Sequence, residues 1–467
     1  MGRDPVRKQG NIDPAVWAVE EGVERLCAAA DNARPLRIVV MSHSHPALSK
    51  GGAEIAAYQH FTMLKTLGHE AVFIASGSGR VVPRDGVSFS QEFAEDEYLY
   101  SDNRFDHFIH GNLDPAYPAR LKDLLSEIRP DVVHLHHYIN FGVETLLHIR
   151  RALPACKIIV TLHEYIAICH HMGQMVKTGG FRLCDESGYR DCAKCFPDKS
   201  ERDFFLREIY VKRFFDLVDH FVAPSAFLRG RYVAWGLSES QISVIENGLP
   251  LQEDRIVPPR DLGSQAEIRI GYFGQISVLK GINVVIDAAK QIAKRNESGA
   301  GNLNIRFCVF GDHSGQPPAF RERFEQDLQS APASTFTFMG PYSNVAVQTL
   351  MGSVDAVLVP SIWWENSPLV IQEAFRAGRP VICSDIGGMA EKVRDGLDGF
   401  HFQAGSAASL CDVLQSIAAD PDKLSRIAQT QRRPLSLEDA VTRLVQIYRD
   451  LPDASELKPA ARGADVD

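Results

Sequence analysis

Two glutamates in the second half of the chain have a setting that suits a ligand with both phosphate and hydroxyl groups. Glu365 precedes a predicted helix, and Glu373 lies on it after seven intervening residues. Carboxylates only accept hydrogen bonds, so two of them suit a polyhydroxylated ligand. The amides of Leu369 and Val370, at the positive end of the helix dipole, form an anion site. A nucleotide sugar carries all these groups. Alternatively, Glu365 complements the dipole and Glu373 is solvated.

The segment around these glutamates is predicted to form a strand, a loop, a helix and a second strand. Buried-strand runs at 355–360 and 380–383 flank a helix that Ser367 can cap, Pro368 can begin and Gly378 can end. In a parallel sheet, such a loop and helix start lie at the carboxyl edge, where ligands bind. We therefore place the candidate ligand at this edge.

The segment resembles the Glu-x-x-x-x-x-x-x-Glu signature of retaining glycosyltransferases of family 4, which have the GT-B fold. The resemblance implies that Glu365 contacts hydroxyls of the transferred sugar and that Glu373 contacts the ribose. It also implies that a group of neighbouring residues binds the donor, with two of its amides on the diphosphate: Asn366, Ser367, Leu369 and Val370. Many members have Gly where this chain has Pro368, which removes one amide donor.

A second candidate site follows the first predicted strand of the chain, at 36–41. A helix start at Gly51-Gly52 comes next, and paired glycines let the backbone approach a ligand closely. The P-loop sequence is missing, and an ordinary tight turn is an equally good interpretation. In the family that this chain resembles, this loop faces the donor phosphates.

His163 follows a predicted strand at 157–161 and is placed for ligand contact at the sheet edge. Taken alone, such a histidine is more often structural. The similarity to the family segment Thr-Leu-His-Asp implies that His163 faces the donor sugar and stabilises charge during transfer. Weaker candidates for an acceptor pocket, with strand-end packing as the alternative, are His43, His45, His134, His136 and His137.

The stretch after the strand at 268–273 is similar to the family pattern Gly-Arg-x-x-x-x-Lys-Gly, whose two cations neutralise the leaving diphosphate. Lys280 matches, whereas Gln275 replaces the arginine. Losing a fixed charge weakens leaving-group stabilisation unless another cation replaces it. Substitute cations that we consider are Lys50, Arg376 and Arg379. The structural alternative for Lys280 is an exposed residue before a helix.

Four of the nine cysteines lie within an irregular segment, at Cys169, Cys184, Cys192 and Cys195. Four thiolates could close a structural zinc site that holds a loop too polar to build a core. The main alternative is reduced thiols. His170 and His171 are alternative ligands. The resemblance implies no metal or other cofactor for catalysis.

The helix predicted over 204–215 interleaves aromatic and basic residues. This pattern fits peripheral contact with an anionic membrane that carries a lipid-linked acceptor. Packing against the first sheet, with solvated cations, is the favoured interpretation.

Bulk properties indicate a globular protein of two domains. The chain has 467 residues, 45% of them hydrophobic and 23% charged. Its net charge of -9 argues against nucleic acid as a partner. We expect an α/β fold of GT-B type, with two Rossmann-like, doubly wound parallel-sheet domains and an interdomain cleft. The expected parts are an N-terminal extension (1–35), an N-terminal acceptor-side domain (36–251) with the cysteine insert (169–195), a linker (252–265), a C-terminal nucleotide-sugar domain (266–435), a helix that crosses back to the first domain (436–452) and a tail (453–467).

The expected function is transfer of a sugar from a nucleoside diphosphate sugar to an acceptor hydroxyl with retention of configuration. Family resemblance favours a glycan or lipid-linked glycan acceptor in polysaccharide or glycolipid biosynthesis. Alternatives are another GT-B enzyme, such as a nucleotide-sugar epimerase or a phosphorylase, and a non-catalytic sugar-nucleotide-binding protein. We found neither a membrane-spanning run nor a signal-peptide core, so we expect a cytoplasmic location, with membrane contact at most peripheral.

Overall fold

The computed structural model describes residues 34–49, 51–77, 88–101, 104–180, 182–250, 258, 260, 266–299 and 303–452. Lys50, most of the expected N-terminal extension and linker, and the tail at 453–467 lie outside these residues. The chain divides into two compact units. Unit 1 comprises Met1–Val160, Phe214–Asp219 and Leu437–Asp467, and unit 2 comprises Thr161–Arg213 and His220–Ser436. The expected domain boundary at residue 251 stays a prediction.

Unit 1 is built on a mainly parallel sheet. Its strands follow one another in the order β8-β7-β1-β2-β4-β3, and only β3 and β4 pair antiparallel. The strands are β1 (Arg37–Ser42), β2 (Glu70–Ser76), β3 (Phe89–Ser90), β4 (Glu97–Tyr100), β7 (Val132–Leu135) and β8 (Lys157–Thr161), and a separate hairpin joins β5 (Phe105–Asp106) to β6 (Gly111–Asn112). All but the first residue of β1 are buried, as expected for a parallel strand covered on both faces.

Among the described residues of unit 1 there are four helices, three of them in its first part and one in its last. They are α1 (Gly52–Thr66), α2 (Tyr117–Ile128), α3 (Thr145–Ala152) and α14 (Leu437–Asp450). The last helix is attached to the sheet through Tyr448. The hydroxyl of Tyr448 lies 2.6 Å from Nδ1 of His134 on β7, and Lys157 Nζ donates to the Tyr448 carbonyl at 2.9 Å.

Unit 2 contains an all-parallel sheet in the order β13-β12-β11-β14-β15-β16. Its strands are β11 (Ile268–Phe273), β12 (Ile305–Phe310), β13 (Phe336–Gly340), β14 (Ala356–Val359), β15 (Val381–Ser384) and β16 (Gly399–Phe402). Another parallel pair of unit 2 is β9 (His220–Ala223) with β10 (Ile242–Val244).

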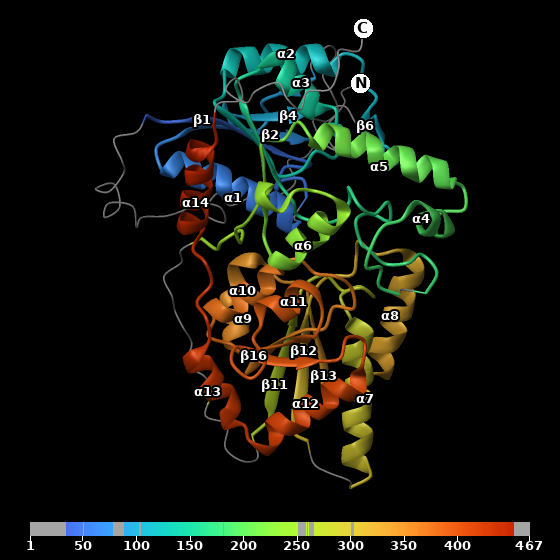
Figure 1. The fold of residues 1–467 in the computed structure, drawn as a ribbon. Helices are drawn as coiled ribbons and strands as arrows, with labels where there is room; N and C mark the ends of the chain where they lie inside the picture. Colours follow the sequence, from blue (N-terminus) through green and yellow to red (C-terminus); the bar gives the residue numbers. More distant parts are fainter. Residues whose placement is uncertain are drawn as a thin grey trace, which may run out of the picture. The chain divides into compact units, whose positions relative to one another are not determined.

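Unit 2 has helices on both faces of its six-stranded sheet, and other helices, before residue 236, that do not cover this sheet (Figure 1). They are α4 (Tyr189–Cys195), α5 (Glu201–Phe215, whose last two residues belong to unit 1), α6 (Ala226–Trp235), α7 (Ile282–Glu297), α8 (Pro318–Ser330), α9 (Val347–Gly352), α10 (Leu369–Arg376), α11 (Gly387–Lys392), α12 (Ala407–Ala419) and α13 (Asp422–Thr430), with short 3-10 turns at Glu239–Gln241 and Asn344–Ala346. The alternation of side chains along β11 explains this arrangement. Ile270 and Tyr272 enter a hydrophobic cluster with α7 and α12, whereas Phe273 enters another with α9, α10 and α11. The predicted α/β fold with a doubly wound parallel sheet is confirmed.

The predicted strand, loop, helix and strand around the two glutamates are present as β14, α10 and β15, with one correction. The helix begins at Leu369, so Pro368 takes the cap position and Ser367 does not cap. Proline fixes its own backbone angle and has no amide hydrogen, which makes it compatible with the position just before a helix. Gly378 ends the helix with φ 67°, as predicted.

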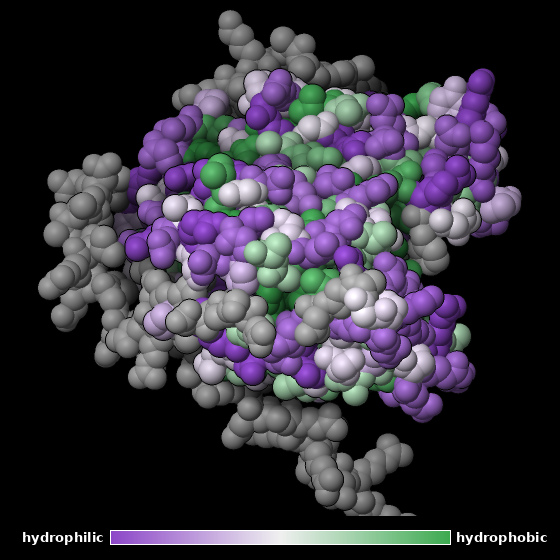
Figure 2. Space-filling view, turned by 90° about the horizontal axis from the view of Figure 1, so that it is seen from below, coloured by the Kyte–Doolittle hydropathy of each residue, from purple (hydrophilic) through white to green (hydrophobic). Residues whose placement is uncertain are grey.

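Hydrophilic residues predominate on the face of the molecule shown in Figure 2. Among the residues that the structure describes, we find no helix with the length and apolar content needed to cross a membrane.

Candidate active site

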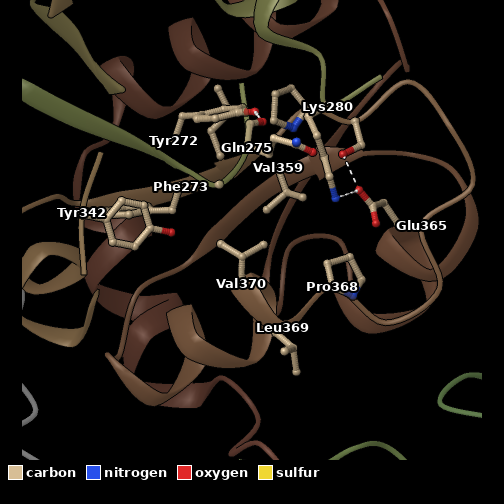
Figure 3. Close-up of a pocket in the computed structure, with 14 residues that line it drawn as sticks. Tyr272, Phe273, Gln275, Lys280, Tyr342, Val359, Glu365, Pro368, Leu369 and Val370 are labelled. Atoms are coloured by element: carbon tan, nitrogen blue, oxygen red, sulfur yellow. Dashed lines mark hydrogen bonds and ion pairs between the residues drawn. The ribbon is translucent and has the colours of Figure 1, made fainter. Parts of the chain in front are cut away.

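A pocket in unit 2 opens where β11 and β14 end and α10 begins (Figure 3). It has a volume of about 170 Å³. Its lining comes from these sheet-edge segments and from Tyr342: Tyr272, Phe273, Gly274, Gln275, Lys280, Tyr342, Leu358, Val359, Pro360, Ser361, Glu365, Pro368, Leu369 and Val370. The predicted helix-start site therefore shares one pocket with Lys280 and Glu365.

Lys280 and Glu365 form an ion pair at the wall of this pocket. The distance from Lys280 Nζ to Glu365 Oε1 is 2.5 Å, and the dashed lines of Figure 3 join the two side chains. The same oxygen accepts a hydrogen bond from Ser361 Oγ at 2.8 Å and one from the indole of Trp363 at 3.0 Å. Because Glu365 is only 7% exposed, these donors offset the cost of burying its charge.

Close backbone approach holds the ion pair in place. Gly281, which follows Lys280, has φ 77°, and a Cβ added there would lie 1.8 Å from the carbonyl oxygen of Pro360. A Cβ on Gly388, in the first turn of α11, would lie 1.7 Å from the carbonyl oxygen of Asn366. Glycine at these positions lets the Lys280 loop meet the end of β14 and lets α11 support the loop that carries Glu365.

The start of α10 adds backbone donors to the pocket. Leu369 and Val370 are its first two residues, and both line the pocket. The first amides of a helix have no acceptor within the helix, and the helix dipole is positive there. The wall of the pocket therefore combines one ammonium group with amides suited to an anion.

Glu373 lies on α10 outside the pocket lining. Burial raises the pKa of its carboxyl group, and the nearby Arg376 only partly opposes this effect. Burial and the charge of Glu373 raise the pKa of Tyr342, which does line the pocket. The second glutamate is thus a desolvated group beside one of the pocket residues.

Asn366 connects the pocket loop to His163. Its side-chain amide donates a hydrogen bond to the His163 backbone carbonyl at 2.6 Å. This bond joins two segments of unit 2 that lie far apart in the sequence. Neither side chain lines the pocket. Ser367 accepts from Gln372 at 3.3 Å, and Gly51 and Gly52 belong to the start of α1 in unit 1. Donor contact by these residues stays a prediction.

Two of the substitute cations considered for Gln275 are engaged elsewhere, which corrects that hypothesis. Arg379 is 1% exposed and donates to the carbonyls of Met351 and Gly352, and Arg376 donates to the Pro250 carbonyl. Lys50 lies outside the described residues. Gln275 itself lines the pocket, and Lys280 is the cation there among the residues that the structure describes.

Sequence reasoning missed two residues that support the Glu365 loop, Trp364 and Arg231. The indole of Trp364 donates to the Cys184 carbonyl at 3.1 Å. The Arg231 guanidinium on α6 lies 4.7 Å from the Trp364 ring and 4.9 Å from the Phe227 ring. The local signal for these contacts was the Trp363-Trp364 doublet beside Glu365. Indole N–H groups need acceptors and indole rings need packing partners, so the doublet indicated supporting residues without identifying them.

The four cysteines of the irregular segment do not form disulfides. Burial raises the pKa of Cys169 to about 11 and also raises that of Cys192. Within the described part of the chain, no three His, Cys, Asp or Glu side chains are arranged to hold a metal ion. As they lie here, the cysteines do not fit a zinc site, and zinc binding stays an untested prediction.

Two of the weaker histidine candidates are paired with carboxylates in unit 1. His43 Nε2 lies 3.3 Å from Glu54 Oε1, and His45 Nε2 lies 3.0 Å from Glu97 Oε2. Burial opposes ionisation of Glu54, but the hydrogen bond and charge of His43 prevail and lower its pKa to about 2. His43 and His45 follow the carboxyl end of β1, and their partners are Glu54 in the first turn of α1 and Glu97 at the start of β4.

The other three histidine candidates are buried. Burial, followed by the charge of His43, lowers the pKa of His137 well below its usual range. His134 and His136 on and just after β7 have ring centroids 4.4 Å apart, and His134 also contacts Tyr448. For His134 and His136, the strand-end packing alternative describes what the structure shows.

Solved structures with the same arrangement of parallel sheets are glycosyltransferases of the GT-B class. Sucrose-phosphate synthase from Thermosynechococcus elongatus matches with a TM-score of 0.66 and 19% identity, covering 89% of this chain and 98% of that one. Anabaena HepE in complex with UDP and glucose matches with a TM-score of 0.61 and 16% identity, covering 89% and 100%. At these identities the likeness establishes the fold.

Two family models then define the family. The model described as Glycosyltransferase Family 4 matches residues 50–253, and the model described as Glycosyl transferases group 1 matches residues 259–433. The chain belongs to the family 4 glycosyltransferases of the GT-B fold.

Curated relatives agree with this assignment. D-inositol 3-phosphate glycosyltransferase of Nocardia farcinica is 29% identical over 307 residues, 64% of this chain and 60% of the relative. The protein of the same name from Mycobacterium tuberculosis is 26% identical over 350 residues, 72% of this chain and 65% of the relative. The chain therefore spans less than two thirds of the length of these relatives.

Proposed function

We propose that this chain transfers a sugar from a nucleoside diphosphate sugar to an acceptor hydroxyl with retention of configuration. The observation that carries the proposal is the Lys280–Glu365 pair, 2.5 Å apart beside the first amides of α10. It is an anion site next to a carboxylate acceptor, the combination that a sugar diphosphate needs.

The reaction breaks the bond between the anomeric carbon and the diphosphate oxygen and forms a bond between that carbon and the acceptor oxygen. Lys280 and the amides of Leu369 and Val370 stabilise the negative charge that develops on the departing diphosphate. The acceptor hydroxyl attacks from the face on which the diphosphate departs, which retains the configuration without a protein nucleophile. Its proton goes to a diphosphate oxygen, so no protein base is needed. Glu365 accepts hydrogen bonds from sugar hydroxyls and holds the ammonium group in place before the donor arrives.

UDP-sugars are the first donors to test, because the Anabaena HepE structure contains UDP and glucose. The name of the curated relatives makes a phosphorylated polyol the first acceptor to test. Glycan and lipid-linked glycan acceptors in polysaccharide or glycolipid biosynthesis, as expected from the family resemblance, form the second group. His163 keeps its proposed role at the donor sugar, supported by the bond from Asn366 to its backbone.

The proposal is tested by incubating the purified chain with UDP, GDP, dTDP and ADP sugars, with and without acceptors. Donor binding raises the unfolding temperature, since the ligand binds the native state. Transfer releases free nucleoside diphosphate only when acceptor is present, and proton NMR of the product reads its anomeric configuration.

A matched pair of variants assigns the reaction to this pocket. Glu365→Gln should lower turnover by about a hundredfold while donor binding persists, because the amide removes the negative charge that positions Lys280. Glu267→Gln, which changes a carboxylate paired with Arg306 away from the pocket, should turn over normally. Donor binding without turnover for any acceptor would favour a non-catalytic binding protein, and conversion of donor without acceptor would favour an epimerase.

A further inference from the structure

Helix α5 exposes an apolar stripe on the surface of unit 2. Phe205, Leu206 and Ile209 are 50%, 49% and 48% exposed. Ile209 follows Leu206 by three positions and Phe205 by four, so the three side chains lie on one face of the helix. Large apolar side chains that gather on one surface mark an interaction site more often than the same residues scattered singly.

The opposite face of α5 already accounts for the packing that the sequence predicted. Phe204 and Val211 are buried, and Arg207 donates to the backbone carbonyls of Ala167 and Ile166. The buried face therefore supplies the main attachment of α5 to its own unit, and about half of each stripe side chain stays exposed. This helix is apolar on two sides, whereas a helix that only covers a core is polar on its outer side.

Basic residues flank the stripe. Arg202 and Arg213 are exposed on the same side of α5, and no acidic side chain of the described residues forms an ion pair with either. Residues 189–213 contain seven Lys and Arg against five Asp and Glu, whereas the whole chain has a net charge of -9. Without Arg207, which is buried, the segment has six Lys and Arg against five Asp and Glu, so the surface around the stripe is slightly basic within an acidic protein.

Helix α4 extends the stripe with an amphipathic aromatic residue. Tyr189 is 43% exposed, and its ring lies 6.2 Å from that of Phe205 at an angle of 80°. Arg190 lies over the Tyr189 ring at 5.7 Å. Figure 1 shows α4 beside the N-terminal end of α5. Tyrosine and arginine next to aliphatic and phenyl groups are the side chains that occupy the boundary between lipid headgroups and acyl chains.

We propose that the surface formed by Tyr189, Arg202, Phe205, Leu206, Ile209 and Arg213, here called the α5 surface, docks on an anionic phospholipid bilayer. The apolar side chains enter the headgroup boundary, and the two arginines contact lipid phosphates. An anionic bilayer is favoured over a protein partner because, among the described residues, no acidic side chain lies within ion-pair distance of Arg202 or Arg213, although the charge of Asp203 acts on Arg202. The inference does not depend on the proposed reaction.

The test is sedimentation of the full chain with vesicles of phosphatidylcholine alone or with about a third phosphatidylglycerol, at low and high salt. The chain should bind the anionic vesicles more tightly, and high salt should remove the difference. Arg202→Gln with Arg213→Gln should weaken binding to anionic vesicles about thirtyfold, since each surface cation contributes about fivefold. Phe205→Ser with Leu206→Ser and Ile209→Ser should weaken binding to both vesicles by about tenfold or more.

Matched controls change the same kinds of residue elsewhere on unit 2. The charge control is Arg321→Gln with Arg323→Gln, two exposed arginines on α8, and the apolar control replaces three residues that are 52%, 63% and 53% exposed, Met339, Val345 and Leu397, by serine. Both controls should bind like the unaltered chain. Absence of binding to anionic vesicles, or equal losses in the controls, would overturn the proposal. So would a dimer in sedimentation velocity that the serine variant of the α5 surface dissociates, because the surface would then pair copies of the chain.

Discussion

Each unit places a carboxylate and a nitrogen base at the carboxyl edge of its parallel sheet, and the two pairs differ in the base and in its support. In unit 1, His43 follows β1 and lies 3.3 Å from Glu54 on α1. In unit 2, Lys280 follows β11 and lies 2.5 Å from Glu365 on a loop. An ammonium group keeps its charge at neutral pH, whereas an imidazole can exchange a proton there.

The two pairs therefore differ in their nitrogen group, which is an ammonium in unit 2 and an imidazole in unit 1. In the proposed reaction the departing diphosphate needs a positive charge that is present throughout, and we assign this role to Lys280. The His43 pair instead joins a ring nitrogen to a carboxylate that is buried on α1. The supports differ as well, because Glu54 is carried by a helix of its own unit, whereas Glu365 depends on side chains from several loops.

The largest effect is expected from removing the fixed charge. Lys280→Ala should lower the turnover number for nucleoside diphosphate release about a thousandfold, because the leaving group loses its ammonium partner and Glu365 keeps an uncompensated charge. Lys290→Ala is the matched control, since Lys290 lies on α7 and its partner Asp327 is 3.9 Å away. If Lys280→Ala keeps its turnover within about threefold of the unaltered chain, the ammonium charge of Lys280 is not what distinguishes the unit 2 pair from the unit 1 pair.

A second prediction compares the glycines beside the two pairs. Gly281→Ala should destabilise the protein by about 4 kcal/mol, because φ is 77° and the added Cβ meets the backbone carbonyl of Pro360 at 1.8 Å. Gly51→Ala should cost about 1 kcal/mol, since its φ is -91° and the new Cβ meets only the Glu54 carboxylate, at 2.3 Å. Urea unfolding measures both. Equal losses would mean that the two pairs are held alike.

Sequence reasoning predicted the elements around the site better than the contacts between them. The strand, loop, helix and strand from β14 to β15 follow from local patterns, namely apolar runs, Pro368 and Gly378. The spacing of apolar residues that marks a helix or a strand lies within a few consecutive positions, so the sequence alone predicts these elements. The one-residue error at the cap arose because Ser367 and Pro368 both suit a helix start.

Contacts between distant residues could not be predicted from patterns. Lys280 and Glu365 were each implied by family resemblance, but nothing in the sequence indicates that they touch across 85 positions. The placement of Arg379 shows the same limit. An arginine near a predicted anion site suggests a ligand contact, yet the fold buries its guanidinium among backbone carbonyls. Such outcomes depend on packing of the whole unit, which local spacing does not determine.

The third prediction tests the unit 1 pair through acid. The pKa of Glu54 is about 2, below its ordinary value of 4.5, so the pair contributes stability above about pH 4.5 and loses it as pH falls towards 2. Glu54→Gln should therefore cost about 3 kcal/mol at pH 7 and progressively less below pH 4.5. Urea unfolding at several pH values measures this, with the exposed Glu70→Gln as control. If Glu54→Gln lowers the free energy of unfolding equally at every pH, the contact between Glu54 and His43 depends on packing and not on the charge of the carboxylate.

The smallest effect tests the support of the unit 2 pair. Arg231 lies over the rings of Phe227 and Trp364, which also contact one another, and a lysine there would lose the planar guanidinium while keeping the charge. Arg231→Lys should lower turnover about fivefold, equivalent to about 1 kcal/mol, because Trp364 adjoins Glu365 and the carboxylate is less well positioned.

The control for this substitution is Arg229→Lys on the same helix, where the partner Glu239 is 69% exposed and loss of the pair should change little. Turnover and unfolding temperature are measured together for both variants. If Arg231→Lys lowers stability but leaves the turnover number unchanged, Trp364 is only a packing residue. If Arg231→Lys lowers turnover at unchanged stability, Glu365 depends on the support that Trp364 and Arg231 give to its loop. Glu54 lies on a helix and needs no such support, and this is the difference between the two pairs.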